Sequence, residues 1–234
     1  MNLRLACSLG ITALLVAAVP ASAQVRAQRG AENPNQPCGM IYTDHYGPYD
    51  FRTQRGSLKI VEDFHVTARV ESLTGAQSGY IGGDLNYTLR ASPNHHRALV
   101  SLMRWVERNK ADQTRGMDFP AECYFDRAIR FRPDDTVVRA LYAQFLHKRN
   151  RTEEGLKQLD LAVGMAEDNA LTHYNLGLVY LELGATDQAL AQAHRAMALG
   201  FPRQDLANEL KKLGRWRDPV PAAPAASAAS ASAG

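Results

Sequence analysis

The apolar positions between Ala170 and Pro202 predict a pair of antiparallel helices. The first helix is expected over Ala170–Leu183, and its apolar cluster has the i, i+1 and i+4 spacing of one helical face: Leu176, Gly177 and Tyr180. The second helix carries small residues at Ala189, Ala193 and Ala196. Because Gly177 and Ala189 lack bulky side chains, we expect the two helices to approach each other closely.

The ends of the first helix carry local signals. Asp168 and Asn169 are residue types that cap helix starts. Gly184 is suited to a left-handed helix end. These residues predict that the first helix begins directly after Asn169 and ends directly before Gly184.

The pattern recurs 34 residues upstream, over Thr136–Asn169. There the apolar cluster is taken by Tyr142, Ala143 and Leu146, and the small positions by Gly155, Leu159 and Ala162. Asp134 and Asp135 are expected to cap the first helix of this copy, and Thr152 the second.

A third, less regular copy precedes these two. Its second helix is predicted in CYFDRAIRFRPDD, which contains a closing proline at 133. Its first helix is predicted over His95–Arg108, with Ser92 or Asn94 as cap, and the linker Asn109–Phe119 is longer than a short turn. After the last pair, Gln204–Leu213 is expected to form a capping helix, because the final pair would otherwise expose its apolar face.

The Leu-Gly-x-x-Tyr sequence at 176–180, the 34-residue period and the closing proline resemble the tetratricopeptide-repeat family, over residues 94–213. The resemblance implies an all-α fold, a tetratricopeptide-repeat helix-pair stack of about three repeats plus a capping helix, with the repeat domain at 94–216. In this family the first helix of each repeat lines a concave face that binds a protein or peptide partner. The groove residues implied by the resemblance are Gln144, His147, Tyr174, Asn175 and Leu178.

Residues 38–93 do not follow the repeat. The segment is rich in Tyr, Gly and Pro, which predicts an irregular or mixed block that packs on the repeats. Leu58–Phe64 and Val66–Leu73 have helical or mixed spacing, and Gly79–Asp84 is expected to be a turn. Whether this block fills the concave groove or leaves it free is open at this stage.

The N-terminal end of the chain predicts export, and both ends predict segments outside the folded domain. Residues 1–23 have the basic start, the apolar run and the small residues of a signal peptide, with cleavage expected after Ala23. Residues 24–37 are expected to be a flexible linker, and residues 217–234, rich in Ala, Pro and Ser, a disordered tail. We therefore expect a periplasmic or secreted protein of bacterial type, with no transmembrane segment in the mature chain.

Charge and cysteine content refine this picture. The formal charge of +3 falls to +2 when the signal peptide, with Arg4 as its one charged side chain, is removed. So small an excess argues against a nucleic-acid partner, which would need clustered Lys and Arg.

The export compartment is oxidising, and the two remaining cysteines, Cys38 and Cys123, are predicted to form a disulfide.

The sequence displays no catalytic signature, so neither an enzyme nor a cofactor is expected. No HExxH, CxxC, GxSxG or phosphate-binding loop occurs. His95 and His96 are a possible ligand site, but adjacent helical residues diverge by about 100° and share one metal ion poorly. The leading hypothesis is a periplasmic scaffold that binds a protein or peptide, possibly within an envelope assembly. The alternative is a metal- or small-ligand-binding protein that uses the histidine-containing N-terminal block.

Overall fold

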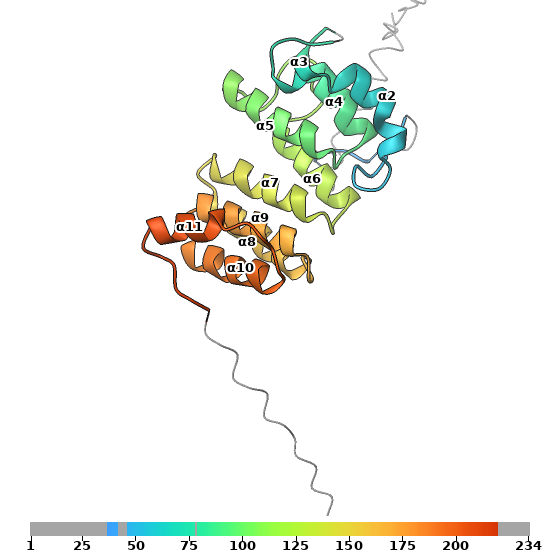
Figure 1. The fold of residues 1–234 in the computed structure, drawn as a ribbon. Coiled ribbons are helices and arrows are strands. Elements are labelled where there is room, and N and C mark those ends of the chain that lie inside the picture. Colours follow the sequence, from blue (N-terminus) through green and yellow to red (C-terminus); the bar gives the residue numbers. More distant parts are fainter. Residues whose placement is uncertain (1–36, 42–45, 78, 220–234) are drawn as a thin grey trace, which may run out of the picture. The chain divides into compact units, whose positions relative to one another are not determined.

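The computed structural model describes residues 37–41, 46–77 and 79–219, and in them the chain forms ten α-helices and no strand (Figure 1). The helices are α2 Arg55–His65, α3 Ala68–Glu71, α4 Ile81–Ala91, α5 His96–Asn109, α6 Ala121–Phe131, α7 Thr136–His147, α8 Thr152–Gly164, α9 Ala170–Glu182, α10 Thr186–Ala198 and α11 Asp205–Lys212. The all-α prediction is confirmed for these residues. The predicted signal peptide, all but the last residue of the linker, and the tail beyond residue 219 lie outside them.

Two helical hairpins form the C-terminal half. Helix α7 packs against α8, and α9 against α10 (Figure 1). Helix α9 begins at Ala170, 34 residues after the start of α7 at Thr136, and α10 begins at Thr186, 34 residues after the start of α8 at Thr152. Helix α11 packs on α9 and α10, where the capping helix was predicted.

Each hairpin has one glycine where its two helices meet. A Cβ added to Gly155 of α8 would lie 2.9 Å from the backbone oxygen of Ala143 on α7. A Cβ added to Gly177 of α9 would lie 3.5 Å from the backbone oxygen of Ala189 and 2.4 Å from a terminal methyl of Leu206. The predicted small position at Gly155 is therefore a point of close helix approach, whereas the tightest neighbour of Gly177 is Leu206 of α11.

Substituting Gly155 by alanine is expected to lower the free energy of unfolding by about 1–3 kcal/mol, because the new methyl meets rigid backbone. Gly164 is the matched control, since it ends the same helix and a Cβ there meets nothing within 4 Å. Gly164→Ala should leave stability unchanged or raise it by up to about 1 kcal/mol. Urea unfolding of both variants measures the difference, and equal midpoints would contradict the close approach.

Helix starts follow the predicted caps in two cases of four. Asn169 accepts a hydrogen bond from the Thr172 backbone N–H at 3.0 Å and caps α9. Asp135 caps α7. Helix α5, however, is capped by His95 and not by Ser92 or Asn94, and α8 begins at Thr152 without a side-chain cap. The cap of α5 was mispredicted because Asn94 is used in a longer-range contact, described below.

The N-terminal block contains three helices, α2, α3 and α4, which corrects the expectation of an irregular segment. Of the two stretches with helical or mixed spacing, Leu58–Phe64 lies within α2 and Val66–Leu73 includes α3. Residues 55–65 form helix α2 because Leu58 and Val61 are buried together with Phe51 and Ala91. Helices α2, α3 and α4 pack against one another or against α5. The block thus rests on α5.

The predicted turn at Gly79–Asp84 is instead the start of α4. A Cβ added to Gly82 would lie 2.5 Å from the backbone oxygen of Arg115, so glycine lets the loop after α5 approach the first turn of α4. That loop lies between α5 and α6, where a long linker was predicted.

Two further predictions concern covalent structure and membranes. Cys38 and Cys123 are disulfide-bonded, which confirms the predicted bridge. Among the described residues, none of the helices combines the length and apolarity that a membrane crossing requires.

Candidate functional site

A shallow groove lies between α7 and α9. It encloses about 210 Å³ and is lined mainly by apolar side chains, among them Val137, Ala140, Leu141, Leu176 and Val179, with the polar side chains of Gln144 and Asn175. Every lining residue belongs to α7 or α9, so none of the residues that the structure describes between 38 and 93 lines it.

A second depression, of about 370 Å³, adjoins the first. It is lined by Glu71 of α3 and by α5 residues that include His96, Val100 and Arg104, and it shares Val137 and Leu141 with the groove. The two depressions therefore form one continuous surface over the first helices of the successive pairs. We call this surface the α5–α7–α9 face.

Helical spacing explains which side chains reach this face. On α7, Val137, Leu141 and Gln144 follow one another at i, i+4 and i+7, which is one stripe of a helix. Val138 and Phe145 lie on the other side of α7 and are buried in the core. One apolar stripe thus holds α7 in the fold while a second stripe stays accessible, with Val137 41% exposed.

Most polar groups of the face are paired within the protein. Arg97 makes two hydrogen bonds to Glu71, at 2.6 and 2.7 Å. Gln144 donates to Glu182 at 2.5 Å. By contrast, the side chains of Arg104 and Asn175 make no hydrogen bond or ion pair within the described residues. These two side chains, together with the hydroxyls of Thr136 and Thr172 in the groove, are the polar groups of the face that can still bind a ligand.

The five groove residues implied by the resemblance are not brought together. Gln144 and Asn175 lie on the α5–α7–α9 face. Leu178 is half-buried against the core of the C-terminal hairpins. His147 Nδ1 lies 2.9 Å from Thr152 Oγ1 and ties the end of α7 to the start of α8.

Tyr174 was expected in the groove and is instead buried, with 3% of its surface exposed. Its hydroxyl donates to Asp205 at 3.1 Å, and its ring centroid is 4.6 Å from that of Phe201. Successive helical residues are about 100° apart, so Tyr174 faces α11 while Asn175 faces outward. Tyr174 is therefore unavailable to a groove ligand.

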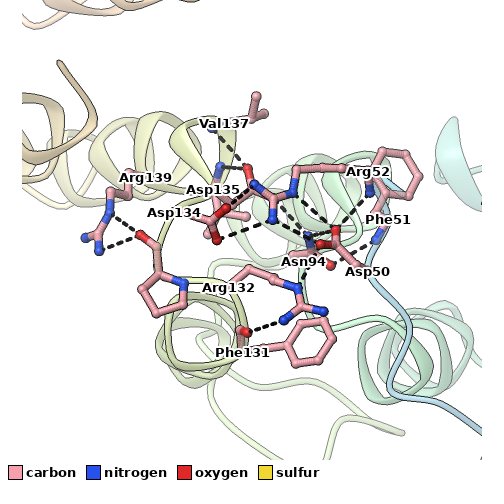
Figure 2. A network of polar contacts seen from close by, with 12 residues as sticks. Asp50, Phe51, Arg52, Asn94, Phe131, Arg132, Asp134, Asp135, Val137 and Arg139 are labelled. Atoms are coloured by element: carbon pink, nitrogen blue, oxygen red, sulfur yellow. Dashed lines mark hydrogen bonds and ion pairs between the residues drawn. The ribbon is translucent and has the colours of Figure 1, made fainter. Parts of the chain in front are cut away.

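The second predicted site, around His95 and His96, adjoins a buried polar network that joins three segments, because His96 contacts Asp135 of that network. Figure 2 shows Asp50, Asn94 and Asp135 within the network. Asn94 is at its centre. Its Nδ2 donates to Asp50 at 2.8 Å and to Asp135 at 2.9 Å, and its Oδ1 accepts from the Phe51 backbone N–H at 3.1 Å. All these groups are at most 5% exposed.

Two arginines neutralise the carboxylates of the network (Figure 2). Arg52 donates to Asp50 and to Asp134, in both cases at 2.9 Å, and Arg132 donates to Asp50 at 2.7 Å. Burial by itself would raise the pKa of Asp50. Hydrogen bonds from Arg52, Asn94 and Arg132 outweigh it and hold that pKa well below its usual range. Asp50 is therefore ionised and fully paired.

The two histidines take different partners in this region. His96 Nε2 is 2.9 Å from Asp135, which also caps α7. His95 is fully buried; its Nδ1 accepts from the Ala98 backbone N–H, so Nε2 carries the proton and donates to Glu62 at 3.2 Å. Burial, together with nearby positive groups, lowers the pKa of His95 to about 3, so the ring is neutral at pH 7.

Through these contacts the region around His95 and His96 connects α2 and the start of α7 to α5. Among the described residues, no group of three His, Cys, Asp or Glu side chains is placed to hold a metal ion. Sequence reasoning missed the network because its three segments lie 41 to 82 positions apart in the chain. The only local signal was the concentration of charged and amide residues at Asp50–Arg52, Asn94 and Asp134–Asp135.

Comparison of the chain with protein-family models, with curated proteins and with solved structures found no match.

Proposed function

We propose that this protein is an exported tetratricopeptide-repeat scaffold that binds a peptide segment of another protein on its α5–α7–α9 face. The observation that carries the proposal is the accessible apolar stripe of α7, continued by Val179 of α9 and flanked by the unpaired side chains of Arg104 and Asn175. We place the protein in the periplasm or outside the cell, with an envelope assembly as its proposed context.

The regular part of the fold supports the repeat component of the proposal. The two hairpins repeat with the family's 34-residue period, and each has a glycine, Gly155 or Gly177, where its two helices meet. The proposed binding face is formed by α5, α7 and α9, the first helices of the successive pairs.

The chemistry of the face fits an extended peptide. An amide such as Asn175 can donate to and accept from a bound backbone. Arg104 can pair with a carboxylate, while the stripe of Val137 and Leu141 buries an apolar side chain. We therefore expect ligands that combine an apolar residue with an acidic one.

A phage-displayed library of random linear peptides, panned on the full chain, tests the proposal. The selected peptides should bind Val137→Glu at least about tenfold more weakly than wild type, because a charge replaces an exposed apolar side chain that both depressions share. Leu161→Glu is the matched control: Leu161 is 49% exposed on α8, outside the face, and this variant should bind within about twofold of wild type. Peptides that bind both variants equally, or a panning that yields no binder, would contradict the proposal.

A further inference from the structure

A second apolar surface lies on α2 and α4, away from the residues of the α5–α7–α9 face. Four large apolar side chains line a depression of about 260 Å³ there: Tyr46, Ile60, Phe64 and Tyr87. Their exposed fractions are 42%, 57%, 56% and 42%. We call this surface the α2 patch. Clustered exposure of this kind marks interaction surfaces in soluble proteins.

Packing in the hydrophobic core does not explain why the α2 patch is apolar. Helix α2 is anchored through Leu58 and Val61, which are buried against Phe51 and Ala91. Ile60 and Phe64 lie one turn apart on a different side of α2 and remain exposed. Helix α2 thus has one apolar side that the fold covers and another that it leaves in water.

The charges beside the patch are balanced and alternate in sign. Lys59 and Asp63 form an ion pair of 2.6 Å along α2, with side chains 77% and 51% exposed. Since both signs are present side by side, the surface does not favour a uniformly charged partner such as an anionic membrane. It is instead complementary to itself when two α2 helices run antiparallel, because each lysine then meets an aspartate of the other helix.

We propose that the α2 patch binds a second copy of this chain, with the α2 helices antiparallel about a twofold axis. In this arrangement Ile60 packs near the partner subunit's Phe64, and Lys59 lies near the partner subunit's Asp63. Four half-exposed side chains offer roughly 400 Å² of apolar surface per copy, from about 200 Å² for each large side chain. That area lies at the low end of specific interfaces, so the dimer is weak, with a dissociation constant in the micromolar range.

Sedimentation equilibrium of the full chain, from about 1 to about 500 µM, tests the dimer. Wild type should show reversible dimerisation, and Phe64→Glu should raise the dissociation constant at least about tenfold. Leu161→Glu, an equally polar change on α8, should associate as wild type does. A wild-type chain that stays monomeric throughout this range overturns the proposal. Equal association of wild type and Phe64→Glu also overturns it.

A charge exchange tests the antiparallel arrangement separately from folding. Lys59→Glu makes positions 59 and 63 of α2 both acidic, and Asp63→Lys makes both positions basic. Each variant alone should dimerise more weakly than wild type, whereas a mixture of the two should form a heterodimer at least about tenfold tighter than either homodimer. A mixture that associates no better than the separate variants would overturn the arrangement. Because α2 lies outside the proposed peptide groove, these results are independent of peptide binding.

Discussion

Replacing Asn94 with leucine is expected to lower the free energy of unfolding by about 3–5 kcal/mol. Asn94 is fully buried and donates to two carboxylates, those of Asp50 and Asp135, which are themselves 3% and 1% exposed. Leucine has nearly the same shape but no donor. The variant therefore leaves each buried carboxylate short of one hydrogen bond, and the Phe51 backbone N–H without its acceptor.

Urea unfolding followed by far-ultraviolet circular dichroism measures this effect. Asn208→Leu is the control, because Asn208 is exposed on α11, and its effect should stay within about 0.5 kcal/mol. A loss of less than about 1 kcal/mol in Asn94→Leu would show that the network contributes little to the joining of the N-terminal block to α5 and α7.

Acidification from pH 6.5 towards pH 4.5 is expected to destabilise the protein through His95. The pKa of His95 is about 3 in the folded protein, whereas an unfolded histidine has a pKa of about 6.5. Between these values the unfolded chain binds a proton that the folded chain does not. The contribution of His95 to stability is therefore complete above pH 6.5 and falls with pH, by up to about 1.4 kcal/mol per pH unit.

His95→Gln isolates this contribution. Glutamine offers both a donor and an acceptor but does not titrate, so the variant should show a shallower fall in the free energy of unfolding between pH 6.5 and 4.5. In the folded wild type, the His95 ring resonances in NMR spectra should not shift through this range. Equal slopes for variant and wild type, or a His95 ring that titrates near pH 6, would contradict the buried neutral state.

Asp50 affects stability at lower pH. Its pKa is lowered in the folded state, so its contribution is present above an unfolded pKa of about 3.8 and is lost as the pH falls below that value. The interval from pH 6.5 to 4.5 therefore separates the effect of His95 from that of Asp50.

Local patterns predicted the C-terminal hairpins well. The helix starts at Thr136 and Ala170, the cap at Asn169 and the left-handed Gly184 depend on contacts that span at most a few residues. The small residues at Gly155 and Gly177 could also be predicted from the sequence, because an alanine stands at the equivalent position of the other helix pair in each case. Such features are local because helix hydrogen bonds and caps join residues three or four positions apart.

The candidate sites were less predictable. Tyr174 and Asn175 are adjacent, and the resemblance placed both in the groove, but only the packing of α11 decides that Tyr174 turns inward to Asp205 and Asn175 outward. The exposed residues of the α2 patch, such as Phe64, show a helical spacing in the sequence, but the spacing does not reveal which apolar stripe is left uncovered.

The amino-acid sequence alone predicts the helical hairpins from α7 to α10 and their 34-residue period, since each rests on residues within one repeat. Tertiary contacts decide that helices form at residues 55–65 and 81–91, that glycine at 82 lies in a helix, and that Asp50, Asn94 and Asp135 meet in one buried network. These outcomes depend on burial against segments about 30 to 45 residues away, and no local pattern specifies which distant surface will exclude water from a given side chain.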